Sequence, residues 1–532
     1  MEIFLLFLLA AAAFLVRIWG ISKLHFWDEM VYLQNAQVIC CGKTNYSELV
    51  SRPPLISLIY AGVFLLWHHI YAACVVTAFL NALGPVFLYL AGRLSVGRMP
   101  AVIAALLLAF SPFFVGIFPA GFVSDDTGNS LLTDSPALTL LLLAFWLLLR
   151  ALNRESSPRF AWAGFVLALS ILMRFGSLPS VGMLFVLPLA AKRRWKALMA
   201  CGAGLLAGLA PYLLWSRLRF GGFFFTLQAG WTKVEGPSES LLFYLRNSAV
   251  IFTPVALFGL VVTASFGIWG FFGAFPLRPR LLKAFPSNLS PLAWQAFLWL
   301  WLLMDLIFFS TMPHKEPRYV LPLTPPFLLL AGFGLALFDA APRRPIRLAG
   351  AVLVAALLTF TLLPIRERFS GPFIDPGIPE EMLASQFLQS ALEPGTILYL
   401  NFNYPPFAFY TSYRIHVLPS KGPALYNAIE QIPPGGVLVV YRKTDEVQEP
   451  DLDWVNANPR FQRIRDYSGF VIFRRLAGAA QSRDPTRQLL LGHLRDHAGS
   501  DDSCATLIRS SALPQRELAE GMALRPNSMR RY

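Results

Sequence analysis

Residues 3–19 read IFLLFLLAAAAFLVRIW, and this apolar run, together with the stretch HFWDEMVY at residues 25–32, decides the fold. The run contains no acid and has Arg17 as its only base, so it is long enough to cross the roughly 30 Å hydrocarbon core of a bilayer. A cleaved signal peptide starts in a similar way, but Arg17, Trp19 and Lys23 stand where its small-residue cleavage site would be. We therefore expect an uncleaved membrane helix that is soon followed by two adjacent acids.

The composition extends this expectation to the whole chain. Of 532 residues, 55% are hydrophobic and 14% are charged, whereas a soluble globular protein carries about 25% charged residues. Further apolar runs follow between residues 70 and 363, which predicts a polytopic α-helical membrane protein with about eleven spanning helices plus interfacial helices. The net charge of +14 would suggest nucleic-acid binding in a soluble protein. Here the bases lie mostly between apolar runs, so we expect a lipid bilayer and no nucleic acid as partner.

Charge also predicts how the chain crosses the membrane. By the positive-inside rule, five basic gaps between apolar runs should face the cytoplasm, namely Arg93–Arg98, Arg150–Arg159, Lys192–Lys196, Arg278–Lys283 and Arg343–Arg347. This alternation requires that the segment Arg52–Trp67 does not cross. Its Pro-Pro start and His-His end favour an amphipathic or re-entrant helix at the interface. The polar clusters in the remaining gaps then share the extracytoplasmic face.

After residue 365 the character of the sequence changes. Short apolar strands alternate with polar stretches at 396–400, 436–441 and 469–473, and Pro379–Ala391 has the pattern of a helix. The tail is rich in Arg, Ser, Asp and Gln without a sustained period, which is typical of disorder. The expected parts are a transmembrane catalytic domain at 1–365, a small extracytoplasmic α/β domain at 370–476 and a disordered tail at 477–532.

Asp28 and Glu29 are the first candidates for chemistry. They come just after the first apolar run, beside Trp27, which is a residue type found at the headgroup level. A carboxylate that is partly screened from bulk water can take a proton from an acceptor hydroxyl or amine as a general base. The alternative is that two surface acids merely keep a loop solvated.

The second candidate cluster is basic and lies just before a late apolar run. His314, Lys315, Arg318 and Tyr319 stand within six residues and suit a lipid-linked phosphate or pyrophosphate, because guanidinium and ammonium groups make charge-assisted hydrogen bonds to it. An anchor for ordinary anionic lipid is the alternative. Arg52, which precedes a Pro-Pro turn, is a further candidate for phosphate binding. The alternative is that it is an ordinary base at a helix end, whose side chain extends to the membrane–water interface.

Asp134 stands in the second outside loop, two residues before a proline that opens an apolar run. This spacing is a good helix N-cap pattern, which alone would explain the residue. The functional alternative is an acid that faces a cavity shared with Asp28. The sequence leaves both interpretations open.

Several common chemistries lack their motifs. No Walker loop, dinucleotide fingerprint or His-Glu-x-x-His zinc motif occurs. Of the five cysteines, Cys40 and Cys41 are adjacent, and no spacing indicates a zinc site or a disulfide framework. We expect no metal site and no resident cofactor, with assistance by a divalent cation left open. The alternative function is a lipid or sugar transporter or flippase, which should place acids near mid-span, where Asp305 is the main one.

Five short motifs stand in an order that resembles a known superfamily. They are Asp28-Glu29, Arg52-Pro53-Pro54-Leu55, Gly92–Arg98, Thr133-Asp134-Ser135-Pro136 and Arg318–Leu323. As a set they resemble the GT-C glycosyltransferases, in particular the bacterial branch similar to protein O-mannosyltransferases and the lipid A aminoarabinose transferase. The likeness covers about residues 1–364.

The resemblance implies a GT-C fold and a membrane glycosyltransferase that transfers a hexose or pentose, with inversion, from a polyprenyl-phosphate donor to an extracytoplasmic lipid, glycan or protein. It implies a multi-pass protein of the bacterial inner membrane. Carried over by position, Asp28 matches the general base, Glu29 its neighbour that helps to hold the acceptor, and Asp134 the second-loop acid. The His-Lys-Glu-x-Arg-aromatic pattern implies that Lys315 and Arg318 neutralise the departing donor phosphate.

Overall fold

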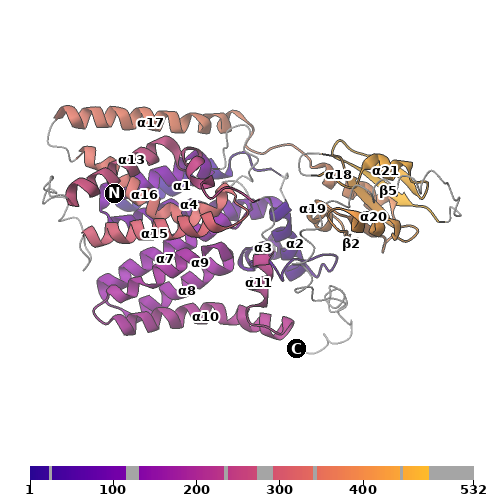
Figure 1. Ribbon diagram of the computed structural model, residues 1–532, viewed down its shortest axis with the longest axis horizontal. Helices are drawn as coiled ribbons and strands as arrows, with labels where there is room; N and C mark the ends of the chain where they lie inside the picture. The colour runs from indigo at the N-terminus through magenta and orange to yellow at the C-terminus, as the bar shows by residue number, and fades with distance from the viewer. Residues whose placement is uncertain are drawn as a thin grey trace.

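The computed structural model describes residues 1–22, 27–115, 131–232, 238–271, 291–339, 344–443 and 447–477. A bundle of helices forms one part of the molecule, and a small α/β domain lies at one end of it (Figure 1). The bundle contains α1 (Glu2–Ile18), α2 (Trp27–Cys41), α3 (Leu55–Leu66), α4 (Ile70–Ser95), α5 (Arg98–Phe110), α6 (Pro112–Val115), α7 (Asp134–Arg154), α8 (Ser157–Met173), η1 (Phe175–Ser177), α9 (Leu178–Phe185), η2 (Leu187–Ala190), α10 (Arg194–Phe220), α11 (Phe225–Thr232), α12 (Phe243–Arg246), α13 (Ser248–Phe271), α15 (Pro291–Thr311), η3 (Pro317–Leu323), α16 (Thr324–Asp339) and α17 (Arg344–Ser370).

Six of the described helical segments are long and apolar enough to cross a membrane. They are Ile70–Ser95, Asp134–Arg154, Arg194–Phe220, Ser248–Ser265, Ala293–Thr311 and Pro317–Phe338. The polytopic helical class predicted from composition is confirmed, although these long segments are fewer than the apolar runs suggested. One reason is visible at the run 178–191, which divides into α9 and η2 at Pro188, a residue that cannot continue an α-helical ladder.

The segment after Arg52 forms a short helix, as its flanking prolines and histidines indicated. α3 has 12 residues, which is about 18 Å of helix and too short for the bilayer core. Its buried face, with Ile56, Tyr60 and Phe64, packs against α2. α3 therefore supports the helix that carries the two adjacent acids.

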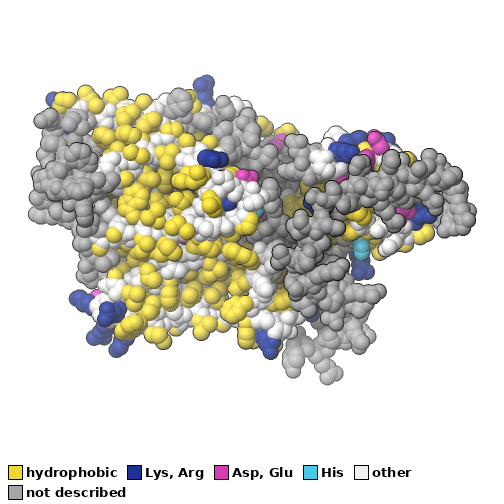
Figure 2. Space-filling view, viewed as in Figure 1, with side chains coloured by type: hydrophobic (Ala, Val, Ile, Leu, Met, Phe, Trp, Pro, Cys, Tyr) yellow, Lys and Arg dark blue, Asp and Glu magenta, His cyan; other side chains and the backbone are white. Residues whose placement is uncertain are grey.

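The bundle is held by close helix packing and presents an apolar exterior. Gly164 of α8 and Gly204 of α10 lie so close to the opposite backbone that an added Cβ would stand 1.9 Å and 1.8 Å from carbonyl oxygens, as small residues allow between membrane helices. Figure 2 shows hydrophobic side chains over much of the visible bundle surface. Phe7 on α1 and Met199 on α10 are exposed members of this kind. Such a surface suits lipid rather than water.

The α/β domain is built on a mixed five-stranded sheet in the order β2-β1-β3-β5-β4. Strands β2, β1 and β3 are parallel, and β5 and β4 are antiparallel to their neighbours. Its elements are α18 (Glu380–Ala391), β1 (Ile397–Leu400), α19 (Tyr404–Tyr410), β2 (Arg414–Val417), α20 (Pro423–Glu430), β3 (Val437–Tyr441), α21 (Leu452–Ala457), β4 (Phe461–Asp466) and β5 (Phe470–Arg475). The three strands expected from apolar runs are present. β2 and β4 were missed because they are edge strands with exposed, charged residues.

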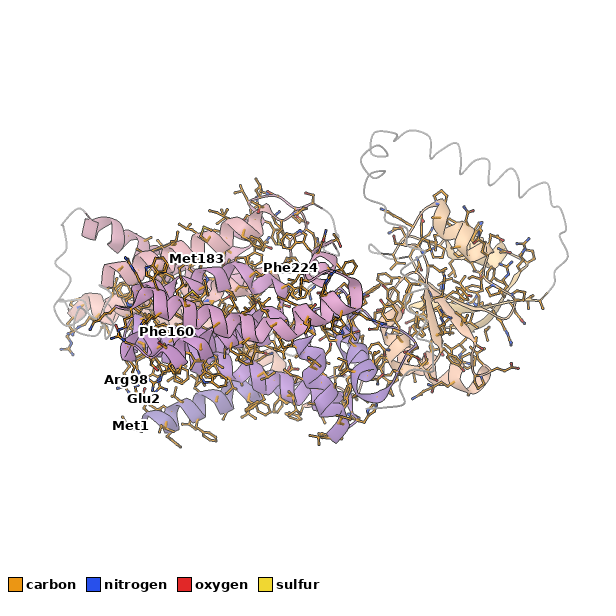
Figure 3. The ribbon with its side chains drawn as sticks, turned by 90° about the horizontal axis from the view of Figure 1, so that it is seen from below. Met1, Glu2, Arg98, Phe160, Met183 and Phe224 are labelled. Carbon is orange, nitrogen blue, oxygen red and sulfur yellow. A yellow bond between two sulfur atoms is a disulfide. The ribbon has the colours of Figure 1, made fainter. Side chains whose placement is uncertain are left out.

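The α/β domain packs onto α2 through α19. The Trp27 ring lies 4.5 Å from the Tyr404 ring and 5.7 Å from the Phe402 ring, measured between centroids. Just after α2, Lys43 Nζ donates to the Ala408 carbonyl over 2.9 Å, and burial lowers the pKa of this lysine to about 8. α2, the helix that carries Asp28, therefore lies between the rest of the bundle and the α/β domain (Figure 3).

Two further points complete the comparison with the sequence. Cys40 and Cys41 form a disulfide at the end of α2, which the spacing did not indicate, because adjacent cysteines join no distant segments. Two expectations concern segments outside the described residues, namely the basic gap Arg278–Lys283 and the disorder expected at 477–532, of which residues 478–532 are not described.

Candidate active site

The first turn of α2 carries Asp28 and Glu29. Acids are favourable there because the exposed N–H groups of a helix N-terminus carry partial positive charge. The two side chains then part. Glu29 is 2% exposed and accepts a hydrogen bond from the backbone N–H of Leu131, while Asp28 is directed at a group of arginines.

Asp28 binds two guanidinium groups at once. Its Oδ1 lies 2.8 Å from Arg52 Nη2, and its Oδ2 lies 3.1 Å from Arg318 Nη2. Burial alone would raise the pKa of this carboxyl, but the positive charges of Arg52 and Arg318 outweigh it and hold the pKa below its usual value. Asp28 is therefore an ionised carboxylate that joins the start of α3 to η3.

Arg52 is held from its other side by Glu48, whose Oε2 lies 3.1 Å from Arg52 Nε. Glu48 is itself fixed, since its backbone N–H donates to Asn35 Oδ1 over 2.9 Å and Tyr46 donates its hydroxyl to the Glu48 carboxylate. The Tyr46 ring lies 5.1 Å from that of Tyr404. The α/β domain thus contacts the residues that orient Arg52.

Arg318 is oriented by Glu316, which forms an ion pair with its Nε. The Glu316 carboxylate also accepts from His314 Nε2 over 3.0 Å and from the Tyr319 hydroxyl over 2.9 Å. Burial would raise the pKa of Glu316, but Arg318 and these hydrogen bonds hold it well below its usual range. Four residues of the predicted phosphate-binding segment therefore converge on one ionised cluster.

A second acid–arginine pair lies beside the first. Arg174 Nη1 stands 2.6 Å from Asp134 Oδ2, and the Arg174 guanidinium lies over the Tyr319 ring at 5.2 Å. The N-cap interpretation of Asp134 is wrong. Asp134 is the first residue of α7, and Thr133 occupies the cap position without a side-chain cap bond. The Asp134 carboxylate instead contacts Arg174. Its Oδ1 is buried and lacks a hydrogen-bond partner within the described ranges.

Lys315 lies apart from this cluster, although its neighbours belong to it. It is 4% exposed, and its ammonium group donates to the backbone carbonyls of Glu239, over 3.0 Å, and Met312. These contacts tie the segment before α12 to the end of α15. The structure thus brings together Asp28, Arg52, Asp134, Arg174, His314, Glu316, Arg318 and Tyr319, with Glu29 and Lys315 directed elsewhere.

Sequence reasoning missed Glu48 and Tyr46. The available signal was the spacing of Glu48 four residues before Arg52, which is the distance at which opposite charges meet on a helical turn. As to cation binding, no three His, Cys, Asp or Glu side chains in the described part of the chain come together as a metal site.

Comparison of the sequence with known proteins gives two matches. The dolichyl-phosphate-mannose-protein mannosyltransferase family matches residues 51–215, which include Arg52, Asp134 and Arg174. GPI mannosyltransferase 3 of Saccharomyces cerevisiae is 35% identical over 86 residues, or 16% of this chain. The matched stretch covers 12% of the length of that yeast protein.

Comparison of the structure gives likenesses over most of the chain. ArnT from Cupriavidus metallidurans bound to undecaprenyl phosphate is 15% identical with a TM-score of 0.58, and the match covers 91% of this chain and 99% of that one. The archaeal oligosaccharyltransferase AglB from Archaeoglobus fulgidus, in complex with an inhibitory peptide and a dolichol-phosphate, is 12% identical with a TM-score of 0.52. That match covers 83% of this chain and 70% of AglB.

Proposed function

We propose that this protein is a membrane enzyme that transfers a sugar from a polyprenyl-phosphate donor to an extracytoplasmic lipid, glycan or protein. The chain has the GT-C glycosyltransferase fold and matches a mannosyltransferase family over residues 51–215. The resemblance to this superfamily is confirmed at the level of fold. The observation that carries the proposal is the Asp28 carboxylate held between Arg52 and Arg318. Both solved relatives named above hold a polyprenyl phosphate, which supports the donor class.

In the proposed reaction Asp28 is the general base. The acceptor oxygen or nitrogen attacks the anomeric carbon while Asp28 takes its proton, and the bond between that carbon and the phosphate oxygen breaks. The bonding electrons leave with the polyprenyl phosphate. A single displacement of this kind inverts the configuration of the sugar, whether it is a hexose or a pentose.

Arg52 and Arg318 receive the donor phosphate. Guanidinium groups bind phosphate oxygens through paired, charge-assisted hydrogen bonds. Both arginines pair with Asp28, so a bound phosphate competes with Asp28 for the same hydrogen-bond donors. Donor binding therefore withdraws positive charge from Asp28, which raises its proton affinity at the moment when a base is needed.

The second pair orients the acceptor or the sugar. The buried Oδ1 of Asp134 can accept a hydrogen bond from a substrate hydroxyl or amine, while Arg174 holds the other oxygen in place. Glu29 acts indirectly, because its bond to the Leu131 backbone fixes the first turn of α2. Lys315 holds the segment around Arg318 through backbone carbonyls.

Location and cofactor use complete the proposal. The positive-inside rule, applied to Arg93, Arg150 and Lys192 with their neighbours, favours an orientation in which the active site and the α/β domain face away from the cytoplasm. The resemblance to the bacterial branch of the superfamily favours the bacterial inner membrane. The transporter alternative relied on Asp305 as a mid-span acid. This residue accepts hydrogen bonds from Ser180 and, over 3.0 Å, from Trp301 Nε1, which gives it a role in packing α15. No resident cofactor is included, and transfer measured with and without EDTA tests for a divalent cation.

The test is transfer by purified full-length protein from radiolabelled polyprenyl-phosphate sugars to a crude envelope extract. Asp28→Asn should lower the rate by roughly 10²- to 10⁴-fold, as expected for loss of a positioned base. Asp466→Asn is the matched control, because Asp466 also pairs with arginine, Arg442, at 2.6 Å on the α/β domain surface. Full activity of Asp28→Asn would refute the assignment, as would an equal loss in both variants.

A further inference from the structure

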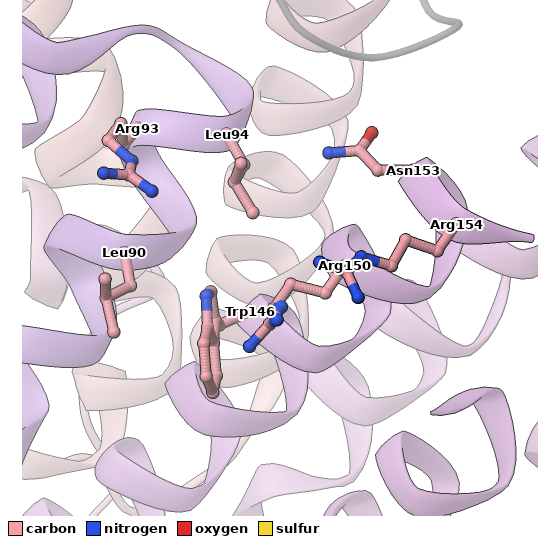
Figure 4. A pocket seen from close by; sticks show the side chains of 7 residues that line it. All are labelled: Leu90, Arg93, Leu94, Trp146, Arg150, Asn153 and Arg154. Atoms are coloured by element: carbon pink, nitrogen blue, oxygen red, sulfur yellow. The ribbon is translucent and has the colours of Figure 1, made fainter. Parts of the chain in front are cut away.

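A pocket of about 360 Å³ lies between the ends of α4 and α7 (Figure 4). We call it the distal pocket and define it by Arg93 of α4 and Trp146, Arg150, Asn153 and Arg154 of α7, with Leu90 and Leu94 on its apolar side. α7 begins with Asp134 in the candidate active site, so Arg150, sixteen residues further on, lies about 24 Å along the helix. The two sites are therefore at opposite ends of a membrane-spanning helix.

The distal pocket carries more positive charge than the carboxylates among the described residues neutralise. Arg93 pairs with Glu2 of α1, but no carboxylate in the described part of the chain pairs with Arg150 or Arg154. The next helix adds Arg159, which is near enough for Arg150 and Arg154 to repel it. Like charges this close destabilise one another unless an anion joins them.

The remaining side chains add the chemistry of a membrane interface. The Arg150 guanidinium lies over the Trp146 ring, 5.0 Å from its centroid, and an indole ring is a side chain that proteins place at the headgroup level. Leu90 and Leu94 give the pocket an apolar side, and the Asn153 amide adds a neutral hydrogen-bond donor. Figure 2 shows basic side chains gathered at the lower left of the bundle.

From this arrangement we propose that the distal pocket binds the phosphate headgroup of an anionic phospholipid. The phosphate bridges Arg150 and Arg154, and the acyl chains lie along the leucines and the apolar exterior of the bundle. Basic pockets between membrane helices are suited to such headgroups. The phosphate contacts α7 through both arginines and the acyl chains contact α4 through the leucines, so one lipid molecule joins α4 to α7 at the end of the bundle opposite the reaction centre.

The experiment measures phosphatidylglycerol binding by full-length protein in phosphatidylcholine nanodiscs, using native mass spectrometry over a titration. Arg150→Ala/Arg154→Ala should weaken binding by roughly 30-fold, at the contribution usual for two bases at a membrane surface. The matched control is Arg193→Ala/Arg194→Ala, which removes the same charge at the same end, where Arg194 also lies 5.9 Å from a tryptophan ring, that of Trp195. It should bind phosphatidylglycerol like the wild type.

Equal binding by all three proteins would overturn the proposal, and so would an equal loss in both variants, which would indicate only a general effect of charge. Thermal unfolding of each variant shows whether a loss reflects misfolding, and Arg150→Lys/Arg154→Lys, which keeps the charge, should retain part of the binding. Inorganic phosphate distinguishes the source of the anion. If millimolar phosphate displaces the lipid completely, the pocket is a site for free phosphate and the lipid assignment is wrong.

Discussion

At the scale of single residues, two opposing effects decide the protonation state of Asp28. Burial favours the neutral carboxyl, while Arg52 and Arg318 favour the carboxylate, and the arginines prevail. A carboxylate that is paired with two cations is a weak base. In the proposed cycle it becomes a useful base only when the donor phosphate draws the arginines away.

This balance predicts a pH profile. Because the folded pKa of Asp28 is depressed, the carboxylate contributes stability that is present above its ordinary pKa of 3.8 and is lost only as pH falls through the lower folded value. We therefore expect kcat/KM for the donor, which reports the free enzyme, to show no acid limb from Asp28 between about pH 5 and 8. A limb near pH 6 that shifts in Asp28→Glu would contradict this reading.

Lys315 and Arg318 stand in one motif but make different contacts. Arg318→Ala should raise the donor KM by about tenfold or more, because a charge-assisted phosphate contact is lost. Lys315→Ala should instead lower the free energy of unfolding by about 1–3 kcal/mol, because two backbone carbonyls lose their donor. Donor titrations and thermal unfolding of both variants check this. A raised donor KM in a fully stable Lys315→Ala protein would contradict this assignment and indicate that Lys315 binds the donor phosphate.

At the scale of elements, α8 and α10 show how the bundle coheres in lipid. Apolar side chains gain little by leaving lipid for a helix interface, so close backbone contact supplies the attraction. Gly164 and Gly204 permit that contact. The pair α8 and α10 in turn supports Arg174, which follows the last residue of α8 and holds Asp134.

The contact predicts a sharp difference between two glycines of α10. At Gly204 a Cβ would stand 1.8 Å from the Ala161 carbonyl oxygen, whereas at Gly202 the nearest atom is 3.6 Å away. Gly204→Ala should cost about 1–3 kcal/mol of stability through overpacking, and Gly202→Ala should be neutral or stabilising by up to about 1 kcal/mol through helix propensity. Thermal unfolding in one detergent compares them, and equal melting temperatures would refute the packing argument.

At the scale of the whole molecule, the α/β domain and the acid–arginine cluster lie at one end of the bundle, and the distal pocket lies at the other (Figures 1 and 3). α2 connects the first two, since its Trp27 packs on Tyr404 while its Asp28 meets the arginines. The molecule therefore has the acid–arginine cluster at one end and the basic pocket at the other, with an apolar belt between them.

This arrangement predicts opposite accessibility of two exposed serines. Ser420 lies in the α/β domain and Ser157 at the start of α8. In a background without native cysteines, a membrane-impermeant maleimide should label Ser420→Cys in intact cells. Ser157→Cys should react only after permeabilisation, because the positive-inside rule puts that end in the cytoplasm. The reverse pattern would invert the proposed orientation.

The sequence by itself determined the features that depend on local hydropathy and charge. The apolar runs specify a polytopic helical protein, and a short run flanked by prolines and histidines specifies α3, which has 12 residues. Alternation of basic gaps put Asp28, Arg52, Asp134 and Arg318 on one predicted face. These properties are readable because a bilayer sorts segments by length and polarity, whatever they later contact.

Only the tertiary structure decided which side chains meet. Asp28 pairs with Arg318, which is 290 positions away in the sequence. Asp134 pairs with Arg174 and does not cap α7. Lys315 donates to backbone carbonyls outside the cluster that its neighbours form. Glu48 enters through its contact with Arg52. Such pairings depend on how helices pack and on the rotamers that the packing leaves open, and neither is encoded in the spacing of residues along one segment.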